Sequence, residues 1–212
     1  MVAKWTETDL PDRIERSLPG LPLHGAHDRY ASELTYGRHK GPPSADARRA
    51  AVLIHLFPTD QGWSLPLTLR PTNLRPHGGQ ISLPGGALEG NETSEEAARR
   101  EFEEELGVPC STVRMLGSLS PIFVFVSNHL VTPWLAVGES HPKWRPQVSE
   151  VAEVIELPLE NLMDPGSLRY TLRAVRGVQF RSPHIAIGSH QIWGATCLIL
   201  GEVVQMLEAA VG

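Results

Sequence analysis

The 212-residue sequence is poor in cysteine and contains only Cys110 and Cys197. Two cysteines cannot form the disulfide framework of a small secreted domain, so reduced thiols in a cytoplasmic protein are the expectation. The N-terminal stretch lacks an apolar core of signal-peptide length, and no apolar run approaches the length that spans a membrane. We therefore expect a cytoplasmic protein with no membrane partner.

The chain is also short of positive charge. Its 19 lysine and arginine residues stand against 24 aspartate and glutamate residues, for a formal net charge of −5. This balance gives no basic footprint for nucleic acid, so we expect a small-molecule substrate instead. An anionic substrate would have to be held by local arginines or by metal ions. The length suits one domain, a hydrophobic content of 41% is sufficient for a core, and a homodimer is compatible with both.

Hydrophobic periodicity indicates alternating strands and helices. Residues 1–47 are polar and proline-bearing and are predicted to form an N-terminal extension of unassigned role, with a short helix near 10–18; residues 48–212 are predicted to form the main domain. Within that domain we predict a hairpin at 50–57 and 63–70, a helix at 93–106, strands at 120–127, 130–138 and 149–159, a hairpin at 167–188, and a closing helix at 192–211. This order favours a mixed sheet with helices on its faces.

The segment GALEGNETSEEAARREFEEELGV, residues 86–108, crowds eight glutamates around two arginines. Thr93 and Glu96 have capping-box spacing, which predicts the helix start. On this helix Glu101, Glu104 and Glu105 share one face, where like charges repel unless a cation lies between them. Oxygen ligands of this kind suit Mg²⁺, and the alternative is an exposed helix rich in charge.

The opposite side of this helix predicts its packing. Ala98, Phe102 and Leu106 are spaced by four and form an apolar stripe that faces the core. Arg100 lies four residues from both Glu96 and Glu104, so we expect it to brace those two carboxylates.

The residues that flank the glutamates carry a resemblance to a known family. Gly86, Glu92 and the run Arg100-Glu101-Phe102-Glu103-Glu104-Glu105-Leu106-Gly107-Val108 match the Nudix box, G-x5-E-x7-R-E-U-x-E-E-x-G-U with U apolar, at every specified position. The resemblance implies an α/β Nudix fold, an α/β/α sandwich with a central mixed β-sheet. It also implies Mg²⁺- or Mn²⁺-dependent hydrolysis of a nucleoside diphosphate derivative.

The resemblance further implies roles for individual residues. Glu101, Glu104, Glu105 and the carbonyl of Gly86 resemble the metal ligands, Arg100 would orient the carboxylates, and Glu92 would support them. Nudix enzymes often take one more carboxylate from outside the box, as a ligand or general base. Glu150 is our first choice and Glu153 the second, and both are equally compatible with exposed strand positions.

The stretch LTLRPTNLRPHGGQISLPGG, residues 67–86, resembles the signature of the coenzyme A diphosphatase subgroup. Proline stands where that signature has its first leucine and its serine, at Pro66 and Pro71, and Leu83 replaces phenylalanine. Residues 149–165 and 190–200 resemble later segments of the subgroup, so the similarity covers about residues 48–205. The implied reaction cuts coenzyme A or acyl-coenzyme A into 3′,5′-ADP and (acyl-)4′-phosphopantetheine.

Four residues upstream of the box are candidates for binding this substrate. Arg70 and Arg75 are among the few positive charges near the acidic helix, and arginine suits phosphate because its planar fork binds bidentately. His77 and Gln80 can add neutral hydrogen bonds. The alternatives are that Arg70 is a surface residue at a strand end and that Arg75 pairs with an acidic neighbour.

Two other functions stay open from the sequence. One is hydrolysis of another nucleoside diphosphate derivative, such as ADP-ribose or NADH, which Pro71 and Leu83 allow. The other is a non-hydrolytic binding domain on the same scaffold, against which the intact set of carboxylates argues.

Overall fold

The computed structural model describes residues 9–20, 27–35, 38–74, 78–175 and 177–211. Its α-helices are α1 (Leu10–Ser17), α2 (His27–Tyr30), α3 (Ser94–Leu106), α4 (Leu159–Met163) and α5 (Gly194–Val211). The strands are β1 (Arg48–Thr59), β2 (Gly62–Leu69), β3 (Ile81–Ser82), β4 (Gly85–Ala87), β5 (Val113–Ser118), β6 (Ile122–Val124), β7 (His129–Gly138), β8 (Glu153–Pro158), β9 (Leu168–Val175), β10 (Val178–Ile187) and β11 (His190–Trp193). Two predicted substrate-binding residues, Arg75 and His77, lie outside the described residues.

A mixed sheet forms the centre of the molecule. Its strand order is β3-β2-β1-β7-β5, with β4 also paired to β1, β6 to β7 and β8 to β2. Strands β1 and β7 run parallel, and the other pairs of this sheet are antiparallel. The apolar run of β1 is buried on both faces, as a central strand requires.

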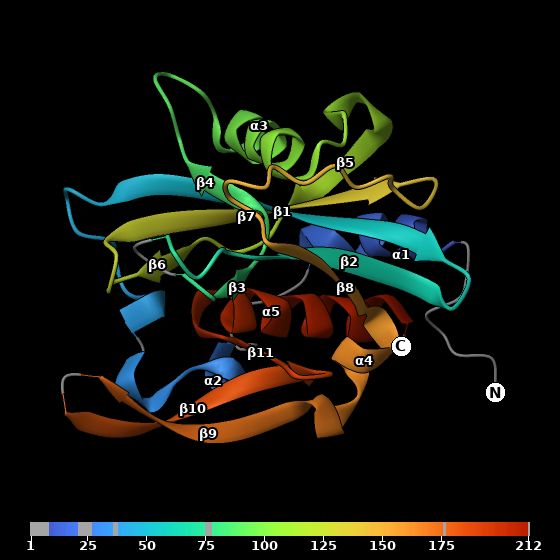
Figure 1. Ribbon diagram of the computed structural model, residues 1–212. Coiled ribbons are helices and arrows are strands. Elements are labelled where there is room, and N and C mark those ends of the chain that lie inside the picture. The colour runs from blue at the N-terminus through green and yellow to red at the C-terminus, as the bar shows by residue number, and fades with distance from the viewer. Residues whose placement is uncertain (1–8, 21–26, 36–37, 75–77, 176, 212) are drawn as a thin grey trace.

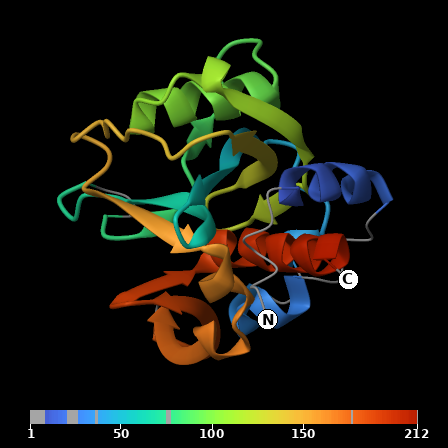
Figure 2. The same ribbon diagram turned by 90° about the vertical axis from the view of Figure 1, so that its right-hand side faces the viewer.

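Helices cover both faces of this sheet (Figure 1). Helix α3 packs on one face, and α5 lies on the other between the mixed sheet and a second sheet of order β11-β10-β9. Figure 2 shows the same layers from the side, with the second sheet beyond α5. The predicted α/β sandwich with a central mixed sheet is confirmed, and the second sheet is an addition to it.

Helix α5 is the core helix of the molecule. Within the described residues it is the one helix long and apolar enough to cross a membrane by length and composition, although 67% of that window is buried inside the protein. The expectation that no segment reaches this length was therefore wrong. Helices α1, α2 and α4 and strand β10 all contact α5, so burial in its own chain accounts for the apolar composition.

Part of the N-terminal extension belongs to this core. Leu10 and Ile14 of α1 are fully buried, and Arg13 Nε donates to the carbonyl of Ala210 at 2.9 Å. The extension thus covers one side of α5.

Most predicted elements are present with shifted ends. The hairpin of β1 and β2, helix α3, strands β6 to β8 and the hairpin of β9 and β10 are confirmed. Strands β5 and β11 were missed, and the predicted closing helix is divided between β11 and α5 at Gly194, whose φ is 68°.

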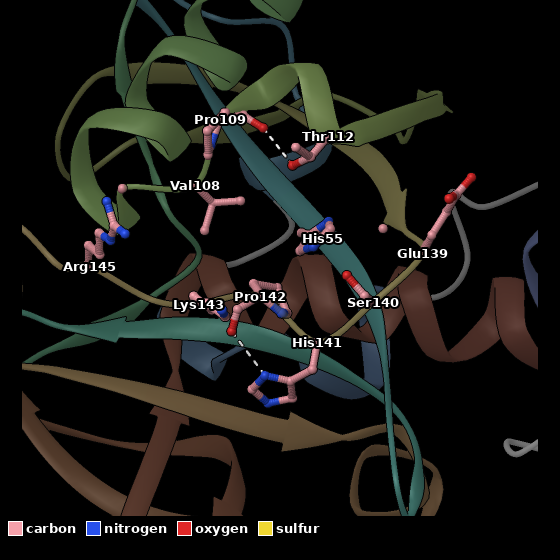
Figure 3. Close-up of a pocket in the computed structure, with 12 residues that line it drawn as sticks. His55, Val108, Pro109, Thr112, Glu139, Ser140, His141, Pro142, Lys143 and Arg145 are labelled. Carbon is pink, nitrogen blue, oxygen red and sulfur yellow. Dashed lines mark hydrogen bonds between the residues drawn. The ribbon is translucent and has the colours of Figure 1, made fainter.

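A cavity of about 370 Å³ lies beside α3 and reaches down to His55 of β1 (Figure 3). The His55 ring is 1% exposed and packs against Phe57 and Phe102. Burial lowers its pKa from 6.5 to about 4, so the folded protein favours the neutral imidazole.

This burial predicts acid sensitivity. The pKa of His55 is lower in the folded protein than in the unfolded chain. The contribution of the buried neutral ring to the free energy of unfolding is therefore complete above pH 6.5 and is lost as the pH falls toward 4. The full loss is about 3 kcal/mol of unfolding free energy. In His55→Phe that part of the pH dependence should disappear while the contribution of the carboxylates remains. Denaturant unfolding of the wild type and of His55→Phe at pH 7, 5.5 and 4 measures this loss. Parallel curves of unfolding free energy against pH for the two proteins would contradict the prediction.

Candidate active site

Helix α3 is fixed at both ends by its own sequence. Thr93 Oγ1 accepts from the Glu96 amide at 3.3 Å, and Glu96 Oε2 accepts from the Thr93 amide at 2.7 Å. This is the predicted capping box, and Gly107 ends the helix with a left-handed φ of 66°. Phe102 and Leu106 are fully buried on the core side, which turns the glutamate face away from the core.

Arg100 is the centre of an ion-pair network. Its Nε and Nη2 donate to the two oxygens of Glu92 at 3.2 and 2.8 Å, and Nη1 donates to Glu101 at 3.0 Å and Glu104 at 3.1 Å. Nη2 also donates to the Ala87 carbonyl at 3.2 Å. Hydrogen bonding to Glu92 is the largest cause that raises the pKa of Arg100, and the same bond lowers the pKa of Glu92.

The expectation that Arg100 braces Glu96 was wrong. The Glu96 carboxylate accepts from both the amide and the hydroxyl of Thr93 within the capping box. Glu92, eight residues before Arg100, takes the place beside the guanidinium.

Glu101 lies against the backbone of Gly86. A Cβ added to Gly86 would lie 2.5 Å from the carboxyl carbon of Glu101, so a larger residue there would force this carboxylate to move. Burial raises the pKa of Glu101, and the hydrogen bond from Arg100 opposes that shift. The predicted ligand pair of Gly86 and Glu101 is therefore in contact.

Glu105 is the most buried carboxylate of the group, at 8% exposed. Burial, and then the charge of Glu101, raise its pKa to about 8, although the Gly85 amide donates a hydrogen bond to it. Its Oε2 is buried and has no hydrogen-bond partner. The unpartnered oxygen of this carboxylate is a buried polar atom that a bound cation would satisfy.

Three further predicted acidic residues lie at or near this site. Glu150 is exposed, and its charge adds a smaller contribution to the raised pKa of both Glu101 and Glu105. Glu153, the second choice, instead pairs with His190 at 3.5 Å. The side chain of Glu104 is 59% exposed and turns toward Arg100. As the side chains stand, no three His, Cys, Asp or Glu residues in the described part of the chain form a ready metal-binding group.

The donor set nevertheless fits a divalent ion. Its members are carboxylate oxygens, the class of ligand that hard divalent cations prefer. The unpartnered oxygen of Glu105 is the observation that supports this fit. Glu101 and Glu105 would hold the ion together with the Gly86 carbonyl, and Glu104 can join after leaving Arg100.

Arg70 faces this site from the end of β2. Its positive charge lowers the pKa of Glu105, against the larger effects of burial and of Glu101. The Nε atom of Arg70 is buried without a hydrogen-bond partner. Its backbone is held by Gln80, whose carbonyl accepts from the Arg70 amide at 3.0 Å. Of the four predicted substrate-binding residues, the structure thus brings Arg70 and Gln80 together.

The loop between β7 and β8 was missed as part of the site. The amides of Arg145 and Gln147 donate to the carbonyls of Leu106 and Glu105 at 2.8 and 2.9 Å, which joins this loop to the last turn of α3. The Glu150 amide then donates to the Gln147 carbonyl at 2.8 Å. These are backbone contacts, so no residue pattern in the sequence signals them.

Comparisons with known proteins show which family this chain resembles. Residues 47–175 match the NUDIX domain family. The chain is 33% identical to a Nudix hydrolase NudL of Photorhabdus laumondii over 78% of this chain and 88% of that protein. It is 35% identical to NudL of Escherichia coli strain SMS-3-5 over 74% and 81%. A solved Nudix hydrolase of M. smegmatis, RenU, matches 56% of this chain and 74% of that one with a TM-score of 0.48 and 24% identity.

The contact between Gly86 and Glu101 gives a testable prediction. Gly86→Ala should displace the Glu101 carboxylate and weaken Mn²⁺ binding about tenfold or more, as expected for the loss of one charged ligand. Gly166→Ala is the matched control, because its φ is not positive and a Cβ there would meet only the Asp164 carboxylate, at 3.3 Å or more. Calorimetric titration with Mn²⁺ measures the affinity of both variants for the ion. Equal affinities in the two variants would remove Glu101 and Gly86 from the metal site.

Proposed function

The chain belongs to the Nudix family. It is a hydrolase of pyrophosphate bonds in nucleoside diphosphate derivatives, and we propose that its substrate is coenzyme A or an acyl-coenzyme A. The products would be 3′,5′-ADP and 4′-phosphopantetheine or its acyl derivative. The proposed ion is Mg²⁺ or Mn²⁺.

One observation carries the diphosphatase chemistry. A buried carboxylate with an unpartnered oxygen, Glu105, lies beside an arginine with an unpartnered buried Nε, Arg70. The first group calls for a cation and the second for an anion, and a diphosphate bound to a divalent ion supplies both. When bound, the ion would neutralise the diphosphate and lower the pKa of the attacking water.

The side chains divide the remaining work. Arg70 would bind a phosphate oxygen through its guanidinium, and Gln80 would add a neutral hydrogen bond, with Arg75 and His77 proposed in the same loop. Arg100 would keep the carboxylates of Glu101 and Glu104 in position. Glu150 would accept the proton of the attacking water, because its position near Glu101 and Glu105 brings a base to the reacting phosphate.

The choice of coenzyme A rests on the resemblance of residues 67–86 to the subgroup signature. Pro71 departs from it and favours a second candidate, another nucleoside diphosphate derivative such as ADP-ribose or NADH. A proline there has no amide hydrogen and no hydroxyl to offer a ligand. In the structure the Pro71 carbonyl accepts from the Leu74 amide at 3.2 Å and closes a turn.

The role of the carboxylates can be tested by exchange of one oxygen. Glu104→Gln should abolish turnover and leave the fold intact, because the side chain is 59% exposed and faces Arg100 rather than the core. The matched control is Glu95→Gln on the same helix, where Glu95 pairs with Arg99 at 3.0 Å. Steady-state rates of both variants, with circular dichroism for folding, measure the difference. A Glu104→Gln enzyme as fast as the control would exclude Glu104 from the mechanism.

The substrate itself is tested by product analysis. The protein is incubated with Mg²⁺ or Mn²⁺ and, in parallel, with coenzyme A, dephospho-coenzyme A, ADP-ribose or NADH, and products are identified by mass. We expect 3′,5′-ADP and a clear preference for coenzyme A. Preference for ADP-ribose or NADH would replace the proposed substrate with the second candidate. No turnover with metal bound would favour a binding domain.

A further inference from the structure

The loop of residues 139–152, between β7 and β8, holds the end of α3 in place. The last carbonyls of a helix have no partner within the helix itself. Here the Leu106 carbonyl accepts from the Arg145 amide at 2.8 Å, and the Glu105 carbonyl accepts from the Gln147 amide at 2.9 Å. The position of Glu105, the most buried carboxylate of the candidate site, is therefore coupled to the position of this loop.

The same loop continues to other residues of the site. The Gln147 carbonyl accepts from the Glu150 amide at 2.8 Å, which closes a turn. The Ala152 amide then donates to the Leu69 carbonyl at 2.8 Å, and Arg70 is the next residue on that strand. One stretch of backbone thus connects the most buried carboxylate, the proposed base and the proposed phosphate-binding arginine.

The first half of the loop lies over a cavity. Every residue from 138 to 145 except Trp144 lines the space of about 370 Å³ that reaches down to His55 (Figure 3). A segment beside a cavity lacks packing atoms on that side, so its position depends on its remaining contacts. Trp144 supplies such contacts, because its ring packs against the core cluster that contains Phe102 and Leu106 of α3.

Trp144 joins the loop to two strands of the mixed sheet. Its indole Nε1 donates to Glu156 Oε1 of β8 at 2.6 Å, and a hydrogen bond to a carboxylate is stronger than one between neutral groups. The ring also meets the buried ring of Phe57 on β1 edge to face, with centres 5.3 Å apart. His141 of the same loop contacts the same two side chains, at 5.2 Å between ring centres for Phe57 and 3.0 Å for Glu156.

A row of rings continues from Trp144 to α3. The ring of Phe57 stacks on that of His55 with centres 5.8 Å apart, and His55 meets Phe102 edge to face at 5.2 Å. Phe102 is fully buried and follows Glu101 directly in the helix. The side chain of Trp144 is therefore linked to α3 through the core as well as through the backbone of the loop.

We propose that Trp144 is a positioning residue of the candidate active site. Its bond to Glu156 fixes the loop of residues 139–152, and the loop sets the positions of Glu105 and Glu150. This inference rests on the proposed function and deepens it, because that function makes one of these carboxylates a metal ligand and the other the base. It assigns Trp144 itself no contact with the substrate or the ion.

Replacing the indole with a phenyl ring isolates the hydrogen bond. Trp144→Phe keeps an aromatic ring beside Phe57 and removes only the N–H group that Glu156 accepts. Trp134→Phe is the matched control, because Trp134 Nε1 also donates to a side chain, Ser94 Oγ at 3.1 Å, and its ring packs against the same core cluster. Trp134 lies on β7 and not in the loop, so the two variants differ in where the bond is lost.

Hydrogen exchange, followed by mass spectrometry on the full-length protein in EDTA, tests the anchoring without catalysis. The amides of residues 145–152 should exchange about tenfold faster in Trp144→Phe than in the wild type, and at the wild-type rate in Trp134→Phe. Glu156→Leu should also accelerate exchange, and adding Trp144→Phe to it should change little more. Unchanged exchange in Trp144→Phe, or additive effects in the double variant, would overturn the proposal.

Steady-state kinetics then test whether the anchored loop matters for the reaction. On whichever of the four diphosphates the wild type hydrolyses fastest, kcat of Trp144→Phe should fall about tenfold while KM changes by less than about threefold. This split is expected because the loop carries the proposed base and the backbone partner of a metal ligand. Trp134→Phe should keep the wild-type kcat. Faster exchange in Trp144→Phe with a kcat equal to that of Trp134→Phe would overturn the positioning role.

These outcomes are separate from failure of the proposed function. If ADP-ribose or NADH is preferred to coenzyme A, the proposed substrate is wrong, and kcat on the preferred substrate still decides the role of Trp144. If none of the four is hydrolysed, the proposed reaction is wrong, and calorimetric titration with Mn²⁺ decides instead. Trp144→Phe should then bind Mn²⁺ about threefold more weakly than Trp134→Phe, and equal affinities would overturn the proposal.

Discussion

The arrangement of the candidate site depends on the hydrogen bonds of one guanidinium. Arg100 makes five hydrogen bonds, to Glu92, Glu101, Glu104 and the Ala87 carbonyl. These bonds match the five N–H groups of the side chain, and a lysine, with three, could not replace it. Because the partners come from the loop before α3, from β4 and from α3 itself, the same side chain that spaces the carboxylates also joins these elements.

Arg100 is not a hydrogen-bond partner of Glu105, the most buried carboxylate of the candidate site, and the proposed chemistry depends on this. Glu105 is left with an unpartnered oxygen and a pKa raised to about 8, next to the charge of Glu101. Such a group opposes folding unless it is protonated or meets a cation. The capping box, Gly107 and the buried stripe stabilise α3 independently of Glu101, Glu104 and Glu105, so the fold tolerates a buried carboxylate with an unpartnered oxygen.

The sequence was informative where interactions are local. The start and end of α3 and its buried face follow from residues within a few positions of one another, so they could be predicted. The partner of Arg100 was assigned wrongly. Helical spacing pointed to Glu96, but the carboxylate of Glu96 is already used by the capping box. The contact of Gly86 with Glu101 and the junction of Glu105 with Gln147 depend on how β4 and the loop before β8 are placed by the sheet, which local patterns do not contain. Arg70 was chosen for its charge, and only the structure shows that its Nε lacks a partner.

The distribution of charge over the chain affects how an anionic substrate approaches the candidate site. The acidic face of α3 lies on one side of the mixed sheet, and the arginine-rich hairpin of β9 and β10 lies beyond α5 on the other (Figure 1). Since residues 165–201 carry four arginines and no carboxylate, the remainder of the chain is more negative than the net charge of −5 suggests. An anionic substrate is therefore repelled by most of the surface, so local positive charge such as that of Arg70 is needed to attract it to the candidate site. Metal ions at the glutamates would remove the repulsion there, so binding of the ion and of the diphosphate should reinforce each other, because each supplies the counter-charge that the other lacks.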